Sequence, residues 1–278
     1  MEIPGESIQV GGLQCESQFV RVGAVSYLNS KPLIHGLASA LEGAGVLSLD
    51  LPSKLADDLA AGQIDIGLIP VVEFFQHPEF RSISTAVIAC KGPVWSVRIF
   101  FRCDPKDVRV LALDDGSRTS VALSKVLFKS RYGFVPETIP LTLADDPMSS
   151  LADAVLVIGD RAMHPEVFRP IFSSDWDLGQ AWLEETGLPF VFALWACRHE
   201  CFVTEKMERK LEAARDRGFQ SVREIATANA AKYRLTAEQC LDYLTNYIRF
   251  ELNSEEQAGL DEFRLRCRRM GLVPSIDF

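Results

Sequence analysis

Two stretches of the chain share one organisation, and this internal repeat limits the fold more than any other feature of the sequence. Residues 20–37 and residues 108–127 each read as an apolar strand, a small polar turn and a helix. The spacing continues beyond them, because Asp153 lies 88 residues after Asp65, just as position 108 lies 88 residues after position 20. A spacing shared over roughly fifty residues predicts two α/β lobes built alike rather than one long sheet.

The composition is that of an ordinary globular protein. Of the 278 residues, 47% are hydrophobic and 24% are charged, which is enough to form one or two sizeable cores. The net charge is −9 and no long basic run occurs, so we do not expect the chain to bind nucleic acid or an anionic membrane surface. No apolar run approaches the ~20 residues of a membrane span. A small anion remains a suitable ligand if helix ends and one or two basic groups hold it locally.

The seven cysteines are scattered, odd in number and without the spacing of a disulfide framework. They read as reduced thiols, which predicts a cytoplasmic protein. Residues 1–19 contain acids and glycines and lack the apolar region of a secretion signal. We expect this segment to be a flexible tail.

The first strand–turn–helix unit places a polar turn above the sheet. Asn29 or Ser30 is expected to cap the helix, and Pro32 suits an early helical position that needs no N–H. Such a turn directs unpaired backbone N–H groups and the positive end of the helix dipole at whatever lies above the strand. It is therefore either an anion site or an ordinary capped turn without a ligand.

The second turn, residues 114–120, is the richest cluster of hydrogen-bond donors in the chain. Gly116 permits an unusual backbone angle beside the start of the helix. Three hydroxyls and the first helical amides are able to surround a carboxylate. The hydroxyls belong to Ser117, Thr119 and Ser120.

Arg118 in the same turn has two possible partners. It either reaches the ligand or forms an ion pair with Asp114 or Asp115, and the ion pair is favoured. The spacing of a Walker loop is missing and no GxGxxG follows either strand, so a nucleotide cofactor is not indicated.

Two further polar groups are expected beyond the carboxyl ends of strands, where open α/β sheets bind their ligands. Pro70 ends one strand, and Glu73 follows it in a short helix. Glu73 either lines the site or stabilises the N-terminus of that helix. The strand over residues 154–158 ends in Gly159 and Asp160.

The chain is expected to pass between the lobes twice. Residues 83–101 form the first crossover, and the apolar run at 190–196 is suited to carry the chain back. This division assigns residues 1–19 to the tail, residues 20–102 and 191–278 to lobe 1, and residues 103–190 to lobe 2.

Ser96 lies among apolar neighbours in the first crossover, where its hydroxyl needs a partner from the backbone or from a ligand. From residue 204 onward the sequence is mainly helical, and we identify no catalytic group there.

Six segments of the chain carry a family resemblance. They are VSYLNSKPL at 25–33, IDIGLIPVVEFF at 64–75, GPVWSVRIFFR at 92–102, LALDDGSRTSVAL at 111–123, VLVIGDRAM at 155–163 and TGLPFVFALWACR at 186–198. Together these segments resemble the chorismate dehydratase family of the futalosine route to menaquinone. That family has the type 2 periplasmic-binding-protein fold, so the resemblance implies two α/β lobes, two crossovers and a cleft between the lobes. The related 1,4-dihydroxy-6-naphthoate synthase shares the fold, but its SPCPNDTF-like opening has no counterpart here.

The resemblance implies a lyase that removes water from chorismate to give 3-[(1-carboxyvinyl)oxy]benzoate, without a metal ion or organic cofactor. The partner is then a small anionic molecule, and a homodimer is left open. A non-catalytic cytoplasmic protein that binds small acids, or the naphthoate synthase, is the alternative.

The resemblance also suggests roles for residues at the matching motifs. Asn29 and Ser96 would face the reacting atoms as catalytic residues. The base would be Glu73, Asp160 or the enolpyruvyl carboxylate of the substrate, and we favour the substrate because a short ether link joins that carboxylate to the carbon that loses its proton. The substrate-binding set comprises Ser26, Tyr27, Pro70, Glu73, Ser117, Arg118, Thr119, Ser120, Gly159 and Asp160.

Overall fold

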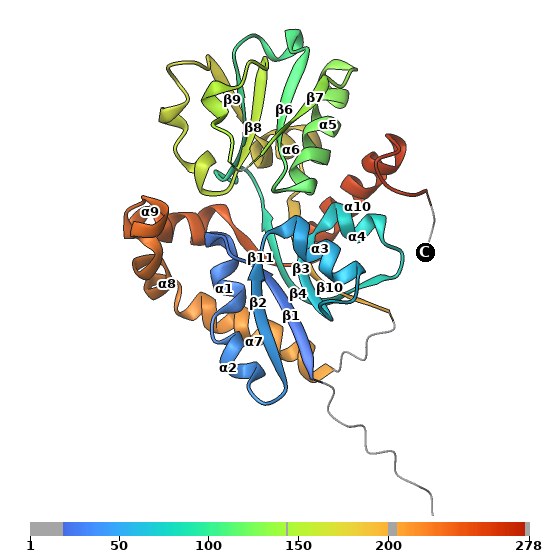
Figure 1. The fold of residues 1–278 in the computed structure, drawn as a ribbon, viewed down its shortest axis with the longest axis vertical. Helices are drawn as coiled ribbons and strands as arrows, with labels where there is room; N and C mark the ends of the chain where they lie inside the picture. Colours follow the sequence, from blue (N-terminus) through green and yellow to red (C-terminus); the bar gives the residue numbers. More distant parts are fainter. Residues whose placement is uncertain (1–18, 143, 200–204, 276–278) are drawn as a thin grey trace, which may run out of the picture.

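The computed structural model describes residues 19–142, 144–199 and 205–275. In this part of the chain two separate sheets form, and each is the centre of one lobe (Figure 1). The six-stranded sheet has the order β11-β4-β10-β3-β1-β2, and the five-stranded sheet has the order β7-β6-β8-β5-β9. The predicted two-lobed α/β fold is confirmed. Residues 1–18 of the predicted tail lie outside the described residues.

The six-stranded sheet is mixed. Strands β1, β2 and β3 run parallel, whereas β10 pairs antiparallel with both β3 and β4. The strands are β1 (Val20–Val25), β2 (Gly45–Asp50), β3 (Ile66–Pro70), β4 (Phe80–Cys90), β10 (Phe190–Arg198) and β11 (Arg249–Glu251).

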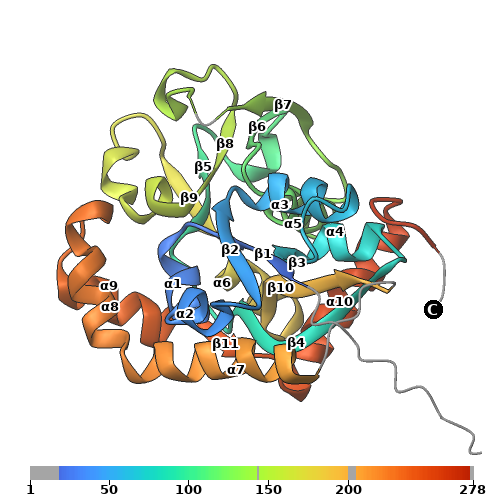
Figure 2. The same cartoon turned by 60° about the horizontal axis from the view of Figure 1, so that its bottom comes forward.

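Two sets of helices cover this lobe. The first set follows its strands and comprises α1 (Lys31–Ile34), α2 (Leu37–Leu41), α3 (Pro52–Ala60) and α4 (Val71–Gln76). The second set comprises α7 (Glu205–Gln220), α8 (Val222–Asn229), α9 (Ala237–Asp242) and α10 (Ser254–Arg269). Figure 2 shows α7 running along the outside of the lobe, where it packs against α1 and β4.

The five-stranded sheet combines a parallel and an antiparallel part. Strand β6 pairs parallel with β7 and β8, while β5 pairs antiparallel with β8 and β9. The elements of this lobe are β5 (Val97–Phe101), β6 (Val110–Asp114), α5 (Arg118–Tyr132), β7 (Glu137–Leu141), β8 (Ala154–Ile158), β9 (Ser174–Asp177) and α6 (Leu178–Thr186).

The internal repeat is visible in the hydrogen bonds as well as in the strand order. The Asp65 carboxylate accepts a hydrogen bond from the backbone N–H of Arg21 at 2.8 Å. Its repeat partner Asp153 accepts from the backbone N–H of Arg109 at 2.9 Å. Because Arg109 lies 88 residues after Arg21, an equivalent aspartate accepts a hydrogen bond beside the start of β1 in one lobe and of β6 in the other.

One predicted boundary needs correction. Residues 97–102 are predicted in lobe 1, but β5 pairs with β8 and β9 in the five-stranded sheet. The strand lies between these two strands, and four of its five residues are buried there. The first crossover therefore lies between β4 and β5, at residues 91–96.

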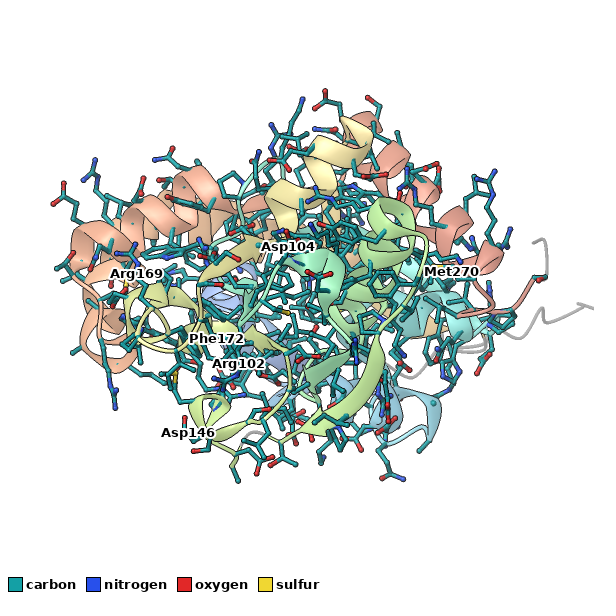
Figure 3. The ribbon with its side chains drawn as sticks, turned by 90° about the horizontal axis from the view of Figure 1, so that it is seen from above. Arg102, Asp104, Asp146, Arg169, Phe172 and Met270 are labelled. Carbon is teal, nitrogen blue, oxygen red and sulfur yellow. The ribbon has the colours of Figure 1, made fainter. Side chains whose placement is uncertain are left out.

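The main hydrophobic core extends through both lobes, and a second cluster lies on the other face of the five-stranded sheet. In this cluster the rings of Phe100 and Phe168 stack with centroids 4.0 Å apart. The guanidinium of Arg102 lies 4.5 Å from the ring centre of Phe172, and Figure 3 shows these two residues together, seen from above. None of the helices in the described part of the chain has the length and apolar character needed to cross a bilayer.

Candidate active site

A cavity lies between the two lobes, where β1, β3 and β8 end and α5 begins. Its polar lining consists of Tyr27, Asn29, Ser96, Ser117 and Ser120. The remaining walls are formed by Val25, Pro52, Pro70, Ile88, Val94, Val97, Ile158, Gly159, Phe192 and Ala193. None of these described lining residues is an acid, a lysine, an arginine or a histidine. The cavity therefore offers neutral hydrogen-bonding groups on an apolar wall.

The first turn is built so that Asn29 faces this cavity. The hydroxyl of buried Ser30 lies 2.6 Å from the carbonyl oxygen of Val25 and 2.8 Å from that of Tyr27, so Ser30 holds the turn together. No side-chain cap forms on α1, which corrects the predicted cap by Asn29 or Ser30. The buried Oδ1 of Asn29 has no hydrogen-bond partner among the described residues. An unsatisfied buried acceptor is costly, so this atom is suited to receive a hydrogen bond from a ligand.

Tyr27 adds a hydroxyl donor to the same turn. Its buried Oη has no hydrogen-bond partner within the described residues. Burial, together with the nearby carboxylates of Asp114 and Asp160, raises the pKa of Tyr27 to about 12. The hydroxyl therefore keeps its proton at neutral pH and is suited to donate to an anion. The neighbouring Ser26 is not in the cavity lining, and its carbonyl oxygen accepts a hydrogen bond from Tyr233 at 3.1 Å.

The crossover loop holds Ser96 in a fixed position. The Asp177 carboxylate accepts hydrogen bonds from the backbone N–H of Val94 at 2.8 Å and of Trp95 at 2.7 Å. The backbone of Trp95, which donates one of these two hydrogen bonds, is left-handed, with a φ of 63°. The Ser96 carbonyl then accepts a hydrogen bond from Gly159, which joins the loop to the end of β8.

The partner of the Ser96 hydroxyl is a tyrosine that the sequence analysis missed. The Tyr243 hydroxyl donates to Ser96 Oγ at 2.9 Å, and both side chains are buried. The sequence analysis expected a backbone or ligand partner and identified no catalytic group after residue 204. Tyr243 belongs to an apolar helical pattern, so its spacing alone indicates a core residue.

The second turn leads into the 15-residue helix α5, whose N-terminus lies at the cavity. Ser117 is the N-cap of α5, and its Oγ accepts a hydrogen bond from the Ser120 N–H at 3.3 Å. The two hydroxyl oxygens lie 2.9 Å apart. The first amides of a helix have no partner within it and carry the positive end of its dipole. This end of the cavity is therefore suited to a carboxylate.

Arg118 and Thr119 face away from this cavity and connect the lobes. The Thr119 hydroxyl accepts a hydrogen bond from the Val72 N–H at the start of α4, at 3.3 Å. Arg118 forms ion pairs with Asp57 at 2.9 Å and with Glu73 at 3.2 Å. The predicted pairing of Arg118 with Asp114 or Asp115 is replaced by these contacts, because α5 packs against α4. Neither residue lines the cavity, and Glu73 is held in the same ion-pair group outside it.

The end of β8 contributes a glycine but not its neighbouring acid. Gly159 lines the cavity with a φ of 67°, and a Cβ there would lie 3.5 Å from the Tyr27 ring. Asp160 is exposed and is not part of the lining. The buried acid nearby is Asp114, which accepts a hydrogen bond from Gly116 and pairs with Arg161. Burial raises the pKa of Asp114, while Gly116 and Arg161 act in the opposite direction.

Comparison with known proteins gives one family and one fold. A family model described as menaquinone biosynthesis matches residues 20–269. The chorismate dehydratase of Thermus thermophilus is 31% identical over 264 residues, which cover 87% of this chain and 93% of the relative. The chorismate dehydratase of Campylobacter jejuni is 26% identical over 248 residues, with 89% and 93% covered.

Solved structures resemble the chain at low identity. A protein from Archaeoglobus fulgidus gives a TM-score of 0.72 at 14% identity and covers 91% of this chain and 98% of its own. A Candida albicans protein described as having the generic periplasmic binding protein fold gives 0.63 at 12% identity, with 93% and 92% covered. These structures confirm the periplasmic-binding-protein fold. Together with the family model and the curated relatives, they show that this chain belongs to the menaquinone biosynthesis family, among the relatives of chorismate dehydratase.

Proposed function

We propose that this protein is a chorismate dehydratase, which eliminates water from chorismate to give 3-[(1-carboxyvinyl)oxy]benzoate. The observation that carries the proposal is the composition of the cavity: an unsatisfied amide oxygen, a fixed serine hydroxyl and a helix N-terminus surround an apolar space without a charged side chain. A site of this kind can bind and orient a diacid, while the substrate brings its own carboxylates.

The second turn is the proposed carboxylate site. Ser117, Ser120 and the first amides of α5 would bind one carboxylate, and the Tyr27 hydroxyl would add a further donor. Apolar contacts with Phe192 and Ile158 would hold the ring. No described lining residue is a cation, so this arrangement would bind the anion through neutral hydrogen-bond donors and the helix N-terminus.

The first turn and the crossover are the proposed reaction site. The C3–H bond breaks, its proton passes to the enolpyruvyl carboxylate, and the electron pair spreads through the ring toward the ring carboxylate. The electron pair then returns into the ring, which becomes aromatic as the C4–O bond breaks. The leaving oxygen takes the proton back from the enolpyruvyl carboxylic acid and departs as water. Asn29 and Ser96 would hold this leaving oxygen, since neither an amide nor an unactivated hydroxyl is a suitable base.

The proposed base is the enolpyruvyl carboxylate of the substrate itself. Glu73 lies outside the cavity lining in an ion pair with Arg118, and Asp160 is exposed outside the lining. Both positions support a base that belongs to the substrate rather than to the protein. Formation of an aromatic ring supplies much of the driving force, so we propose that the reaction needs neither a metal ion nor an organic cofactor.

The cellular setting is part of the same proposal. The described cysteines at positions 90, 103, 240 and 267 are free thiols, which supports a reducing cytoplasm. The reaction would serve the futalosine route. A homodimer remains a prediction that sedimentation tests.

Incubation of the purified protein with chorismate and EDTA, followed by mass spectrometry, tests the function. We expect an aromatic product lighter than chorismate by one water. Bound but unchanged chorismate would indicate a small-acid-binding protein instead, and conversion of a later naphthoate precursor would indicate the related synthase.

A further inference from the structure

One buried hydroxyl contacts a proposed catalytic side chain without lining the cavity. Tyr243 is 1% exposed and begins the π-helical turn Tyr243–Tyr247 that follows α9. Its hydroxyl donates to Ser96 Oγ at 2.9 Å. Tyr243 therefore joins the π-helical turn to the crossover loop.

The hydrogen bond from Tyr243 decides which atom Ser96 offers to a substrate. Ser96 Oγ accepts the tyrosine proton on a lone pair and keeps its own O–H as a donor. Asn29 Oδ1 has no hydrogen-bond partner among the described residues and is an acceptor for the cavity.

We propose that Tyr243 is a positioning residue that fixes Ser96 as a hydrogen-bond donor toward the hydroxyl group that is eliminated, while Asn29 is the acceptor. This inference rests on the proposed function. A hydroxyl group has one proton to give and lone pairs to receive, so one acceptor and one donor hold it in a single orientation. That orientation would direct the C4–O bond for cleavage, and the Ser96 hydrogen bond would strengthen as negative charge develops on the leaving oxygen.

The surroundings of Tyr243 favour an orienting role over a proton-transfer role. Its ring lies edge-on to Trp95 with centroids 5.9 Å apart, and Trp95 is itself held by Asp177. Burial raises the pKa of Tyr243, and the hydrogen bond with Ser96 only partly opposes this effect. The phenol consequently keeps its proton throughout the reaction and acts as a fixed hydrogen-bond donor.

Tyr243→Phe tests the role because it removes the hydroxyl and keeps the ring. We expect kcat for chorismate to fall about 10- to 100-fold while KM stays within about threefold, since the carboxylate site is untouched. Tyr247→Phe is the matched control, because Tyr247 lies on the same turn and packs against the same tryptophan with ring centroids 5.5 Å apart. It should retain wild-type kcat. A Tyr243→Phe enzyme with wild-type kcat would overturn the inference.

A double-mutant cycle with Ser96→Ala separates positioning from general weakening of the core. If Tyr243 acts through Ser96, adding Tyr243→Phe to Ser96→Ala lowers kcat by less than about threefold further. A full additional 10-fold loss would contradict the inference. Should Tyr243→Phe fail to fold, 3-fluorotyrosine at position 243 keeps the hydroxyl and makes it a stronger donor. A change in kcat at constant KM supports the role, and an unchanged kcat contradicts it.

The same assays distinguish failure of the inference from failure of the proposed function. Wild-type protein that does not convert chorismate contradicts the function itself. Active wild-type protein with an equally active Tyr243→Phe variant contradicts the role of Tyr243 alone.

Discussion

The two strand–turn–helix units of the repeat begin alike and end differently. After β1 the chain forms a three-residue 3₁₀ turn and the four-residue helix α1, and Gly36, with a φ of 67°, then separates α1 from α2. After β6 it forms α5, which has 15 residues and a side-chain N-cap. One repeated pattern therefore gives a short turn in one lobe and a long capped helix in the other.

This difference explains how the two turns contribute to one cavity. A long helix concentrates partial positive charge at its N-terminus and suits a carboxylate. A short helix has only a small dipole. The first turn instead presents the unsatisfied side-chain oxygen of Asn29 to the cavity. We infer that the second turn binds substrate charge and the first turn contacts the reacting atoms.

The largest expected effect is the loss of activity in Asn29→Ala. The substitution removes the acceptor that holds the leaving hydroxyl, so we expect kcat to fall roughly 10³-fold. Steady-state kinetics with chorismate provides the measurement, and Asn246→Ala, at an exposed asparagine, is the control. A kcat within tenfold of wild type would remove the first turn from the chemistry.

Changes in the second turn should affect binding more than catalysis. Replacing Ser117 and Ser120 together by Ala removes two donors beside the helix N-terminus, so KM should rise roughly 10- to 100-fold with kcat within about threefold. Ser130→Ala, near the other end of α5, is the matched control. Equal changes in KM and kcat from substitutions in the two turns would show that the turns do not have separate roles in binding and catalysis.

The repeated aspartates allow the lobes to be compared by stability. Asp65→Asn weakens the ion pair and hydrogen bonds to Arg21, and Asp153→Asn weakens hydrogen bonds to two backbone amides. We expect each variant to lower the free energy of unfolding by roughly 1–3 kcal/mol in denaturant titrations. No loss in either variant would show that this repeated contact does not stabilise the lobes.

The Asp65 contribution should also depend on pH. Burial raises the pKa of Asp65, but the bonds from Arg21 outweigh it and leave the pKa below the ordinary value of 3.8. A lowered pKa in the folded state stabilises the protein above the unfolded value, and this stabilisation is lost as the pH falls through the folded value. The stability difference between wild type and Asp65→Asn should therefore shrink below pH 4. A difference that stays constant to pH 2 would contradict this account.

The smallest effects are expected at the two acids outside the cavity lining. Glu73→Gln and Asp160→Asn should each keep kcat within about threefold of wild type, because the proposed base belongs to the substrate. Parallel assays at saturating chorismate measure this. A loss of about 10⁴-fold in either variant would identify that residue as the base.

Local patterns predicted most of the fold. The strands, the turn at Ser117 and the spacing of Asp65 and Asp153 follow from apolar periodicity and capping, which depend on near neighbours. The lobe assignment of β5 depended on which distant strands it would pair with. Periodicity does not contain that information, so residues 97–102 were assigned to the wrong lobe.

The candidate site was predicted less completely because it depends on side-chain direction. The sequence predicts Asn29, Ser96, Ser117 and Ser120 as site residues, and all four line one cavity. Adjacent residues on a helix point in different directions, so Arg118 and Thr119 turn toward α3 and α4 instead. Tyr243 reaches Ser96 across 147 residues, a contact that no local pattern indicates.

The most direct test of the division between the turns is calorimetric titration with the product, 3-[(1-carboxyvinyl)oxy]benzoate. The product keeps both carboxylates and lacks the hydroxyl that Asn29 is proposed to hold. We predict that Asn29→Ala binds it with a Kd within about threefold of wild type, whereas the Ser117→Ala, Ser120→Ala double variant binds it at least about tenfold more weakly. Weakened binding by Asn29→Ala together with wild-type binding by the double variant would contradict the account.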